Sequence, residues 1–430
     1  MSPKYTTIVM LVLIISVSTI SLVLCDDDWP MFGHDPEHSF TNDCEMGDEY
    51  ELLWKYETGG AVLSSPTVVD GMVYVGSWDH CLYCLDAYDG SLEWEYETGD
   101  WVSSSPAIVN SRVYFVSNDS YLYCLDTDDG SLEWKYECYM PVGYSSPTVV
   151  DGMVYIGSDN SYLYCLDAYD GSLEWKYETG GEICSSPTVM NSRVYVGSWD
   201  GYLYCIDAYD GSLEWKYYTN EHGISSSPAI VEGMVYFGLE NHYLLSEAPT
   251  LFCLDAYDGS LEWKYETGDW VSSSPAIMDG RVYFGSLGSY IYCLDAYDGS
   301  LEWKYETGDD IWSSPAVVDG RVYIGSEDSY LYCLDAYDGS LEWKYETGGG
   351  IFSSPGIFES RVYFGSNDNY VYCLESVKPL TATPPPTNTK TNENSTLLPI
   401  IAIGAIILFV ITINRKKHFN DSSNKKGSSP

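Results

Sequence analysis

Tryptophan and aspartate occur side by side at several points of this 430-residue chain, in stretches where otherwise repetitive sequence changes. An indole face attracts cations and packs against sugar rings, and a nearby carboxylate accepts hydrogen bonds or pairs with positive charge. This combination favours the binding of glycans or cationic groups. The candidate ligand-binding residues are Trp78, Asp79, Trp101, Trp199, Asp200, Trp270 and Trp312.

The sequence lacks the motifs of nucleophilic catalysis, phosphate binding and zinc coordination. Cys81 and Cys84 form one Cys-x-x-Cys pair without a partner pair, and along an extended strand their side chains diverge. The carboxylates of "DAYDGSLE" do not follow the alternating ligand spacing of a calcium loop, so we expect them to cap turns. We therefore predict no catalytic residue, no metal ligand and no cofactor.

The charge balance restricts the partners. Residues 26–378 contain 62 Asp and Glu against 13 Lys and Arg. Such a surface repels nucleic acid and anionic lipid headgroups, and it favours cations or basic partners. A nucleic-acid partner is not expected.

The first 25 residues are typical of a signal peptide. A mostly apolar run ends in Val23 and Cys25, which are small enough for the −3 and −1 positions of a signal-peptidase site before Asp26. The alternative is a lipid-anchored Cys25, although Leu24 is bulky for that kind of site. Either alternative exports the chain.

The other end indicates a membrane anchor. Residues 397–413 carry no charge and are just long enough to span a bilayer, and residues 414–430 are basic. The positive-inside rule then predicts a cytoplasmic tail and a single-pass protein of the cell membrane with its bulk outside. The Pro- and Thr-rich residues 378–396 are expected to form a stalk.

Most of the chain is an internal repeat with a period of 40 or 41 residues, interrupted once by seven extra residues. Three kinds of marker recur eight times each. The prolines are Pro66, Pro106, Pro147, Pro187, Pro228, Pro275, Pro315 and Pro355. The cysteines are Cys84, Cys124, Cys165, Cys205, Cys253, Cys293, Cys333 and Cys373. The tryptophans are Trp54, Trp94, Trp134, Trp175, Trp215, Trp263, Trp303 and Trp343.

Each repeat contains four short β-type segments separated by turn residues, as in "SSPTVVDGMVYVGS" and "YLYCLDAYDGSLEWKYE". Four antiparallel strands per repeat, repeated eight times, predict an all-β, eight-bladed β-propeller over residues 51–377, with residues 26–50 as a lead-in. The first Trp marker precedes the first Pro marker. We therefore expect "LLWKYE" to supply the fourth strand of the last blade and close the ring.

The marker tryptophans are predicted to dock one blade on the next. Burying an indole removes about 150–250 Å² of surface from water, and one blade cannot cover that area alone. In the turn before Trp94, Asp86 is expected to accept hydrogen bonds from backbone N–H groups, and Gly90 is expected to adopt a positive φ.

The stretch from Leu85 to Trp94, "LDAYDGSLEW", resembles the repeat of pyrroloquinoline-quinone (PQQ) quinoprotein propellers, with Asp in place of the usual Thr before the glycine. The opening "DWPMFGHDPEHS" is also similar to secreted members of that superfamily, and the resemblance covers residues 28–377. It implies the same propeller fold and two kinds of function. One is a PQQ- and calcium-dependent dehydrogenase, and the other is a cofactor-free scaffold.

Three features favour the scaffold. A member of the alcohol dehydrogenases in this superfamily is expected to have an adjacent-cysteine pair, long insertions between blades and basic groups around the three carboxylates of the quinone. This chain has no Cys-Cys pair, one insertion of seven residues and a strongly acidic repeat region.

The internal copies differ mainly in two connectors, the one before the first strand and the one between the second and third strands. In an up-and-down blade these connectors emerge on the same side, so one face of the disc is diversified and the other is monotonous. Loops on a rigid scaffold are where binding residues concentrate. The alternative is that these tryptophans are wedges between blades and the aspartates are solvated rim charges.

The marker cysteines are expected to be buried and unbridged, because equivalent third strands of adjacent blades fan apart beyond disulfide reach. Cys138 and Cys184 occupy neighbouring connectors and are the candidates for a disulfide. From all of this we expect a non-catalytic module that presents one disc face to a protein, a glycan or an envelope polymer. A PQQ-dependent oxidoreductase and a structural envelope-layer protein are the alternatives.

Overall fold

The chain divides into two units, Met1–Lys378 and Pro379–Pro430. A computed structural model describes part of the first unit, namely residues 29–36, 38–42, 46–138, 145–220, 223–240 and 250–377. The predicted signal peptide, stalk, membrane helix and basic tail lie outside these residues. Within them, no helix is long and apolar enough to cross a membrane.

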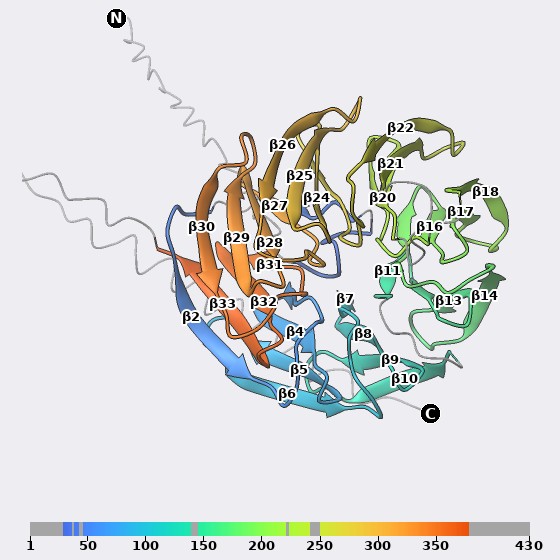
Figure 1. Ribbon diagram of the computed structural model, residues 1–430. Helices are drawn as coiled ribbons and strands as arrows, with labels where there is room; N and C mark the ends of the chain where they lie inside the picture. Colours follow the sequence, from blue (N-terminus) through green and yellow to red (C-terminus); the bar gives the residue numbers. More distant parts are fainter. Residues whose placement is uncertain are drawn as a thin grey trace, which may run out of the picture. The chain divides into compact units, whose positions relative to one another are not determined.

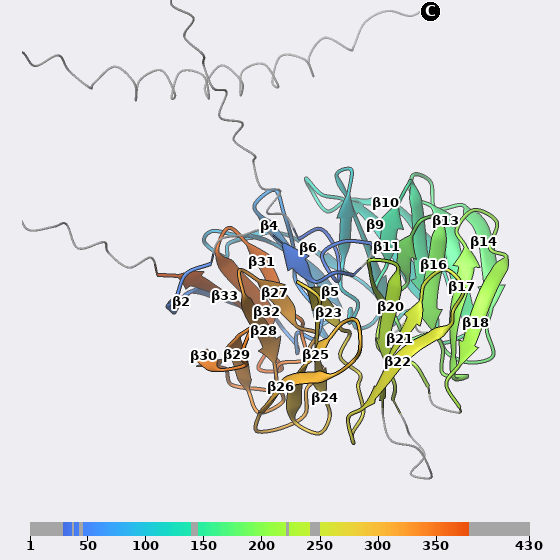
Figure 2. The same ribbon diagram turned by 90° about the horizontal axis from the view of Figure 1, so that it is seen from above.

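The described residues form 33 strands, arranged as eight four-stranded blades that we number 1 to 8 in chain order, plus one short extra strand. Figure 1 shows the blades set around a ring, and Figure 2 shows consecutive sheets standing side by side. The predicted all-β, eight-bladed propeller is confirmed.

The first strands of neighbouring blades lie against one another around the axis. They are β3 (Thr67–Val69), β7 (Ala107–Val109), β11 (Thr148–Val150), β15 (Thr188–Met190), β19 (Ala229–Val231), β23 (Ala276–Met278), β27 (Ala316–Val318) and β31 (Gly356–Phe358). The second strands are β4 (Met72–Gly76), β8 (Arg112–Ser117), β12 (Met153–Gly157), β16 (Arg193–Gly197), β20 (Met234–Gly238), β24 (Arg281–Ser286), β28 (Arg321–Gly325) and β32 (Arg361–Gly365).

The third strands are β5 (Cys81–Asp86), β9 (Tyr121–Asp126), β13 (Tyr162–Asp167), β17 (Tyr202–Asp207), β21 (Thr250–Asp255), β25 (Tyr290–Asp295), β29 (Tyr330–Asp335) and β33 (Tyr370–Ser376). The fourth strands of blades 1 to 7 are β6 (Leu92–Glu97), β10 (Leu132–Glu137), β14 (Leu173–Glu178), β18 (Leu213–Tyr218), β22 (Leu261–Glu266), β26 (Leu301–Glu306) and β30 (Leu341–Glu346).

Burial follows the position of a strand within its blade. Second and third strands such as β4 and β5 are buried on both faces, because each blade is covered by a neighbour on either side. Fourth strands such as β6 alternate between exposed and half-buried residues, as the pattern of "SLEWEYE" predicts. The core is therefore a ring of interfaces between sheets.

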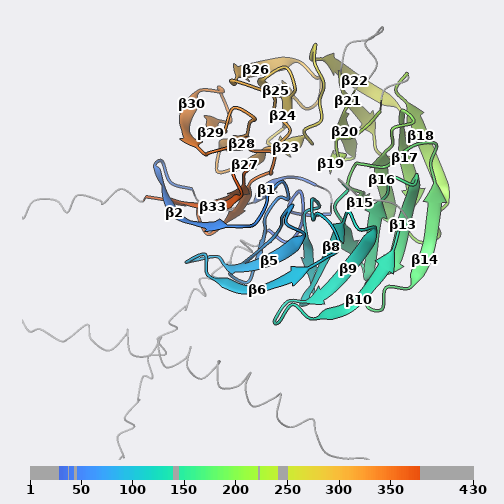
Figure 3. The same cartoon turned by 60° about the horizontal axis from the view of Figure 1, so that its bottom comes forward.

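The chain closes the ring as expected. Strand β2 (Tyr50–Glu57) pairs antiparallel with β33, which places Trp54 opposite Cys373, and it serves as the fourth strand of blade 8. Figure 3 shows β2 beside β33, although more than 300 residues of sequence separate them. The seam joins the beginning of the propeller to its end.

The marker tryptophans dock blades as predicted. Six of the eight indole N–H groups donate to a backbone carbonyl in the turn of the next blade, at 2.9–3.2 Å, as Trp54 does to Ala87. At the seam the same Ala87 carbonyl also accepts from Tyr363 Oη at 3.1 Å. A glycine of the turn lies flat against the ring, and a Cβ built on Gly90 would lie 2.6 Å from Trp54 Cδ2.

A closed circle of hydrogen bonds surrounds the axis. The backbone N–H of one serine in each blade donates to the Oγ of its counterpart in the next blade at 2.9–3.0 Å, and Ser354 completes the circle by donating to Ser65. These serines precede the marker prolines and are Ser65, Ser105, Ser146, Ser186, Ser227, Ser274, Ser314 and Ser354. The circle fixes the inner ends of all eight blades relative to one another.

The described part of the lead-in runs inside the ring. Trp29 exchanges two backbone hydrogen bonds with Val68 of blade 1, and Pro30 and Pro36 accept from blades 2 and 4. Strand β1 (Thr41–Asn42) then pairs parallel with β27 of blade 7. The lead-in therefore follows the inner strands from blade 1 to blade 7 in order.

Replacing Gly90 by alanine is expected to destabilise the propeller by more than the same change at Gly152. Both glycines have a positive φ, of 72° and 79°, so alanine costs about 1–2 kcal/mol at each. A methyl at Gly152 meets nothing within 4 Å, whereas at Gly90 it overlaps the Trp54 ring, which adds about 1–3 kcal/mol. Urea unfolding of both variants measures the difference. Equal losses would contradict the docking role of Gly90.

The cysteines of the described chain are free thiols. The eight marker cysteines are buried, at 0 or 1% exposure, in agreement with the prediction. The disulfide suggested for Cys138 and Cys184 is not formed. Cys138 packs against Leu122 and Tyr164 between blades 2 and 3, whereas Cys184 faces the axial cavity described below.

Candidate functional site

The two variable connectors meet on one face of the disc, as expected. In seven blades the backbone N–H that opens the second-to-third-strand loop donates to a carbonyl of the connector before the first strand, as Trp78 does to Ala61. We call this side the funnel face. Its loops are thereby fixed to a rigid ring and to each other.

An axial funnel of about 510 Å³ opens at the centre of this face. Phe32 of the lead-in lies at its inner end, and the circle of serines forms its inner wall. Farther from the serine circle, the wall contains the residues two positions before those serines. Beyond these, it contains the first residue of the loop between the second and third strands. Apart from the serine circle, the lining residues are Phe32, Leu63, Trp78, Ser103, Cys184, Trp199, Ser225, Glu240, Ser272, Trp312, Phe352 and Asn367.

Three of the five predicted tryptophans line this funnel. The indole N–H groups of Trp78 and Trp199 donate to Ser103 Oγ and Ser225 Oγ, both at 3.0 Å, which holds each ring against the next blade. Trp312 stacks on Phe352 with ring centroids 6.1 Å apart. All three indole side chains therefore contribute to the wall of the cavity.

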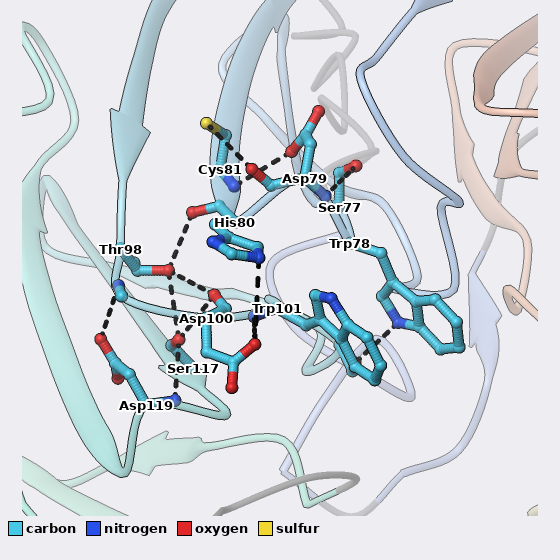
Figure 4. A network of polar contacts seen from close by, with 12 residues as sticks. Ser77, Trp78, Asp79, His80, Cys81, Thr98, Asp100, Trp101, Ser117 and Asp119 are labelled. Carbon is cyan, nitrogen blue, oxygen red and sulfur yellow. Dashed lines mark hydrogen bonds and ion pairs between the residues drawn. The ribbon is translucent and has the colours of Figure 1, made fainter.

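Trp101 and Trp270 are not among the lining residues. Trp101 stacks on Trp78 at 4.5 Å with an angle of 9° between the rings, and it is 40% exposed. Figure 4 shows this pair beside the loops of blades 1 and 2. Trp270 is half-buried on a connector, where its backbone N–H donates to Asp269. Trp101 thus extends the aromatic surface of the funnel outward.

Asp79 and Asp200 do not face the funnel, which corrects the sequence-based interpretation. In Asp200, one carboxylate oxygen accepts from Tyr204 Oη at 2.6 Å and from Gly180 N at 2.7 Å, and the other accepts from Tyr202 N. Asp79 makes the same set of contacts with Tyr83 Oη, Gly59 N and Cys81 N, and Figure 4 shows the last of these. Both carboxylates are used inside the protein to brace the funnel face.

The funnel and its rim are acidic. Glu240 lines the cavity and is 6% exposed, and Asp310 and Glu327 lie beside Trp312. Burial and the neighbouring carboxylates raise the pKa of Asp310 and of Glu327 above their usual values. The site therefore disfavours anions and favours cationic or neutral groups.

The lysine and arginine side chains of the described chain lie outside the funnel. Its five arginines begin second strands, on the side of the monotonous turns, where four of them stack over tyrosines of the next blade. Its seven lysines are on fourth strands, where six cover tyrosine rings of the third strand. None of them is among the described residues that line the funnel.

A second cavity, of about 500 Å³, lies between blades 1 and 2 on the opposite side. It is lined by Met72 and by Asp128, the latter in the turn position that holds an exposed tyrosine in other blades. The missing tyrosine explains the space. We assign it no function.

Sequence reasoning missed Cys184, Glu240, Phe352 and the inner serines. The signal was present in the repeats. The first position of the loop between the second and third strands varies as Trp78, Asn118, Asp159, Trp199, Glu240, Leu287, Glu327 and Asn367. Four of these residues, Trp78, Trp199, Glu240 and Asn367, line the cavity. The next position is aspartate in five of the eight blades, and the internal variation therefore helps to separate cavity-lining from structural positions.

The fold is an eight-bladed β-propeller with a cavity on its axis. The family model described as outer membrane protein assembly factor BamB, a PQQ-repeat family, matches residues 48–142, 140–245, 225–313 and 289–378. The chain belongs to this family. Curated proteins give no significant match to the sequence.

Solved structures with the same fold include both functional kinds. BamB from Moraxella catarrhalis has a TM-score of 0.65 at 16% identity, covering 76% of this chain and 98% of its own. A europium-containing methanol dehydrogenase has a TM-score of 0.67 at 14% identity, and the match covers 81% of this chain and 98% of the dehydrogenase. Quinohemoprotein alcohol dehydrogenase from Comamonas testosteroni has a TM-score of 0.70 at 15% identity, and the match covers 87% of this chain and 82% of the dehydrogenase. At these identities the similarity shows the fold alone.

The funnel does not fit pyrroloquinoline quinone. The three carboxylates of the quinone require positively charged or multiple N–H partners. The described lining offers aromatic rings, hydroxyl groups, one thiol and the carboxylate of Glu240, with no arginine or lysine. The sequence of the undescribed connectors at 139–144, 221–222 and 241–249 contains no arginine or lysine either.

Proposed function

We propose that this chain is a non-catalytic binding module that uses the funnel face to hold a cationic or neutral segment of a partner, either a protein or a glycan. The observation that carries the proposal is the composition of the funnel. Indole and phenyl rings and the carboxylate of Glu240 line a concave site, and positive side chains are absent from its described lining. A lysine or arginine side chain of a partner gains cation–π and ionic contacts there.

The scaffold supports this role. The circle of serine hydrogen bonds and the docked tryptophans hold the funnel rigid, so little conformational freedom is lost on binding. Membership of a family described as an outer membrane protein assembly factor is consistent with protein binding. The apolar and basic pattern of residues 397–430 supports a location outside a membrane, anchored by one helix.

Two alternatives have distinct signatures. Dehydrogenases share the fold, and an oxidoreductase would take up quinone and calcium. Purified protein mixed with both is expected to show neither bound-quinone absorbance nor dye reduction, and a positive result would favour the enzyme. A structural envelope-layer protein would form lattices without any ligand.

Replacing Trp78, Trp199 and Trp312 together by alanine is expected to weaken binding of a lysine- and arginine-rich peptide by about tenfold or more, since each cation–π contact contributes roughly 0.5–2 kcal/mol. Calorimetric titration of the full-length protein measures this, with neutral glycans as a second probe. The matched control replaces Tyr169, Tyr209 and Tyr257, which are 75–80% exposed on the monotonous face. Equal effects of the two triple variants, or binding of neither probe, would count against the proposal.

A further inference from the structure

In the part of the chain that the structure describes, one cluster of side chains beside the funnel makes no hydrogen bond or ion pair with the rest of the protein. Asp159 of the blade 3 loop lies next to Glu182 and Cys184 of the connector into blade 4. One carboxylate oxygen from each acid and the cysteine Sγ all lie within 4.8 Å of one another. Three potential ligands from two connectors thus converge on one point of the funnel rim.

Cys184 gives the cluster a feature that acidic patches lack. Its side chain is 8% exposed, and its thiol has no hydrogen-bond partner within the described protein, yet it points at two carboxylates. The equivalent position holds Leu63, Ser103, Ser225, Ser272, Trp312 or Phe352 in the other described blades. The thiol is specific to this interface between blades.

Asp159 also departs from the repeat. Blades 2 and 8 have Asn-Asp in this loop, and the aspartate braces the loop as Asp200 does. Blade 3 has Asp159-Asn160 instead, and Asn160 performs the bracing by donating to Cys138 O at 2.6 Å and Tyr164 Oη at 2.7 Å. The carboxylate of Asp159 is therefore free to face the rim.

The three acidic groups repel one another when ionised. Burial and Glu182 raise the pKa of Asp159 to about 6, and burial together with Asp159, Glu182 and Glu240 raises the pKa of the Cys184 thiol well above its usual range. No lysine or arginine of the described chain compensates this charge, because all of them lie on other parts of the blades. A bound cation would turn the repulsion into attraction.

We propose that Asp159, Glu182 and Cys184 form a binding site for a thiophilic divalent cation of the Zn²⁺ class. Thiolate with carboxylate suits zinc, whereas calcium and magnesium prefer oxygen ligands alone. In tetrahedral coordination the ligand atoms would be about 3.5 Å apart, which small side-chain rotations can provide from the present separations. Three protein ligands leave a fourth position open toward the funnel.

The site is independent of the ligand proposed for the funnel, and its test does not use that ligand. Full-length protein titrated with Co²⁺ is expected to give a thiolate-to-cobalt absorption band that saturates at one metal per chain and disappears when Zn²⁺ is added. The second carboxylate cluster, Asp309, Asp310 and Glu327, contains no thiol, so cobalt bound there would not contribute to this absorption band.

Cys184→Ser is expected to abolish the band. Serine occupies the same position in blades 2, 5 and 6, so the variant should fold. Asp159→Asn, which copies Asn118 and Asn367, is expected to weaken binding by at least the roughly 10–100-fold lost with outer-shell partners. Cys81→Ser and Cys138→Ser are the controls and should keep the band. A wild-type protein without the band, or a band that survives Cys184→Ser, would overturn the proposal.

Discussion

Trp54→Ala is expected to lower the free energy of unfolding by about 3–5 kcal/mol, the range for deleting a large buried aromatic side chain. Trp54 is 8% exposed and lies on β2 at the seam, where its indole packs on Gly90 and donates to the Ala87 carbonyl. The chain connects β2 directly to blade 1, and β2 pairs with β33 of blade 8. Its contacts therefore help to close the ring, together with the bonds from Ser354 to Ser65 and from Tyr363 to Ala87.

Leu53→Ala is the matched control, because Leu53 is the neighbouring residue on the same strand and is 37% exposed. It is expected to change stability by no more than about 0.5 kcal/mol. Urea denaturation followed by circular dichroism gives both values, and hydrogen exchange shows whether blades 8 and 1 lose protection first. If the two variants were equally stable, closure at the seam would not stabilise the propeller.

The seam and the blades were predictable from the sequence because the same pattern of proline, cysteine and tryptophan markers occurs eight times. The order of the markers alone shows that "LLWKYE" has no first strand before it and that Cys373 has no tryptophan after it. The turn glycine and its tryptophan recur at fixed spacing. Local pattern and global closure therefore lead to the same architecture.

The orientation of the loop aspartates was not predicted. A Trp-Asp pair indicates a binding site only if both side chains face the ligand, and the turn between β4 and β5 directs these two side chains to different surroundings. Trp78 faces the axis, and Asp79 faces Tyr83 and the neighbouring connector. A comparison of the eight repeats distinguishes the structural residue from the cavity-lining one, because Asp79 has counterparts in four other blades while the residue at the position of Trp78 varies.

The path of the lead-in was beyond sequence reasoning for a different reason. Residues 29–42 have no apolar period, and three of their non-glycine residues, His34, His38 and Phe40, have positive φ values of 55–75°. Such a backbone is rarely adopted by these residue types in isolation. Contacts with the inner strands impose it, including the exchange between Trp29 and Val68 and the acceptance by Phe40 of a bond from Val317.

His38 makes this lead-in sensitive to pH. Its side chain is fully buried, its Nδ1 lies 2.9 Å from Thr188 Oγ1 and 3.2 Å from Pro228 O, and its Nε2 has no partner in the described protein. Burial lowers the pKa of His38 from 6.5 to about 4, although nearby Asp35 acts in the opposite direction. Protonation would create a buried N–H without an acceptor.

Between pH 6.5 and 4 the unfolded chain therefore binds a proton at His38 that the folded protein does not bind, so stability falls as the pH is lowered through this window. The shift corresponds to about 3 kcal/mol, fully present above pH 6.5 and lost near pH 4. His38→Asn is expected to remove this part of the pH dependence, because asparagine tolerates the φ of 55° and can place an N–H near the position of Nδ1.

Urea midpoints of wild type and variant, measured from pH 4 to 7.5, test the expectation, since the difference between the two curves cancels the titration of the many surface carboxylates. His34→Gln is the control and should keep the wild-type slope, because His34 is only half-buried beside Asp35. A His38→Asn variant with the wild-type slope would show that the lead-in remains docked with its histidine charged. In that case acid would act on the propeller through its carboxylates alone.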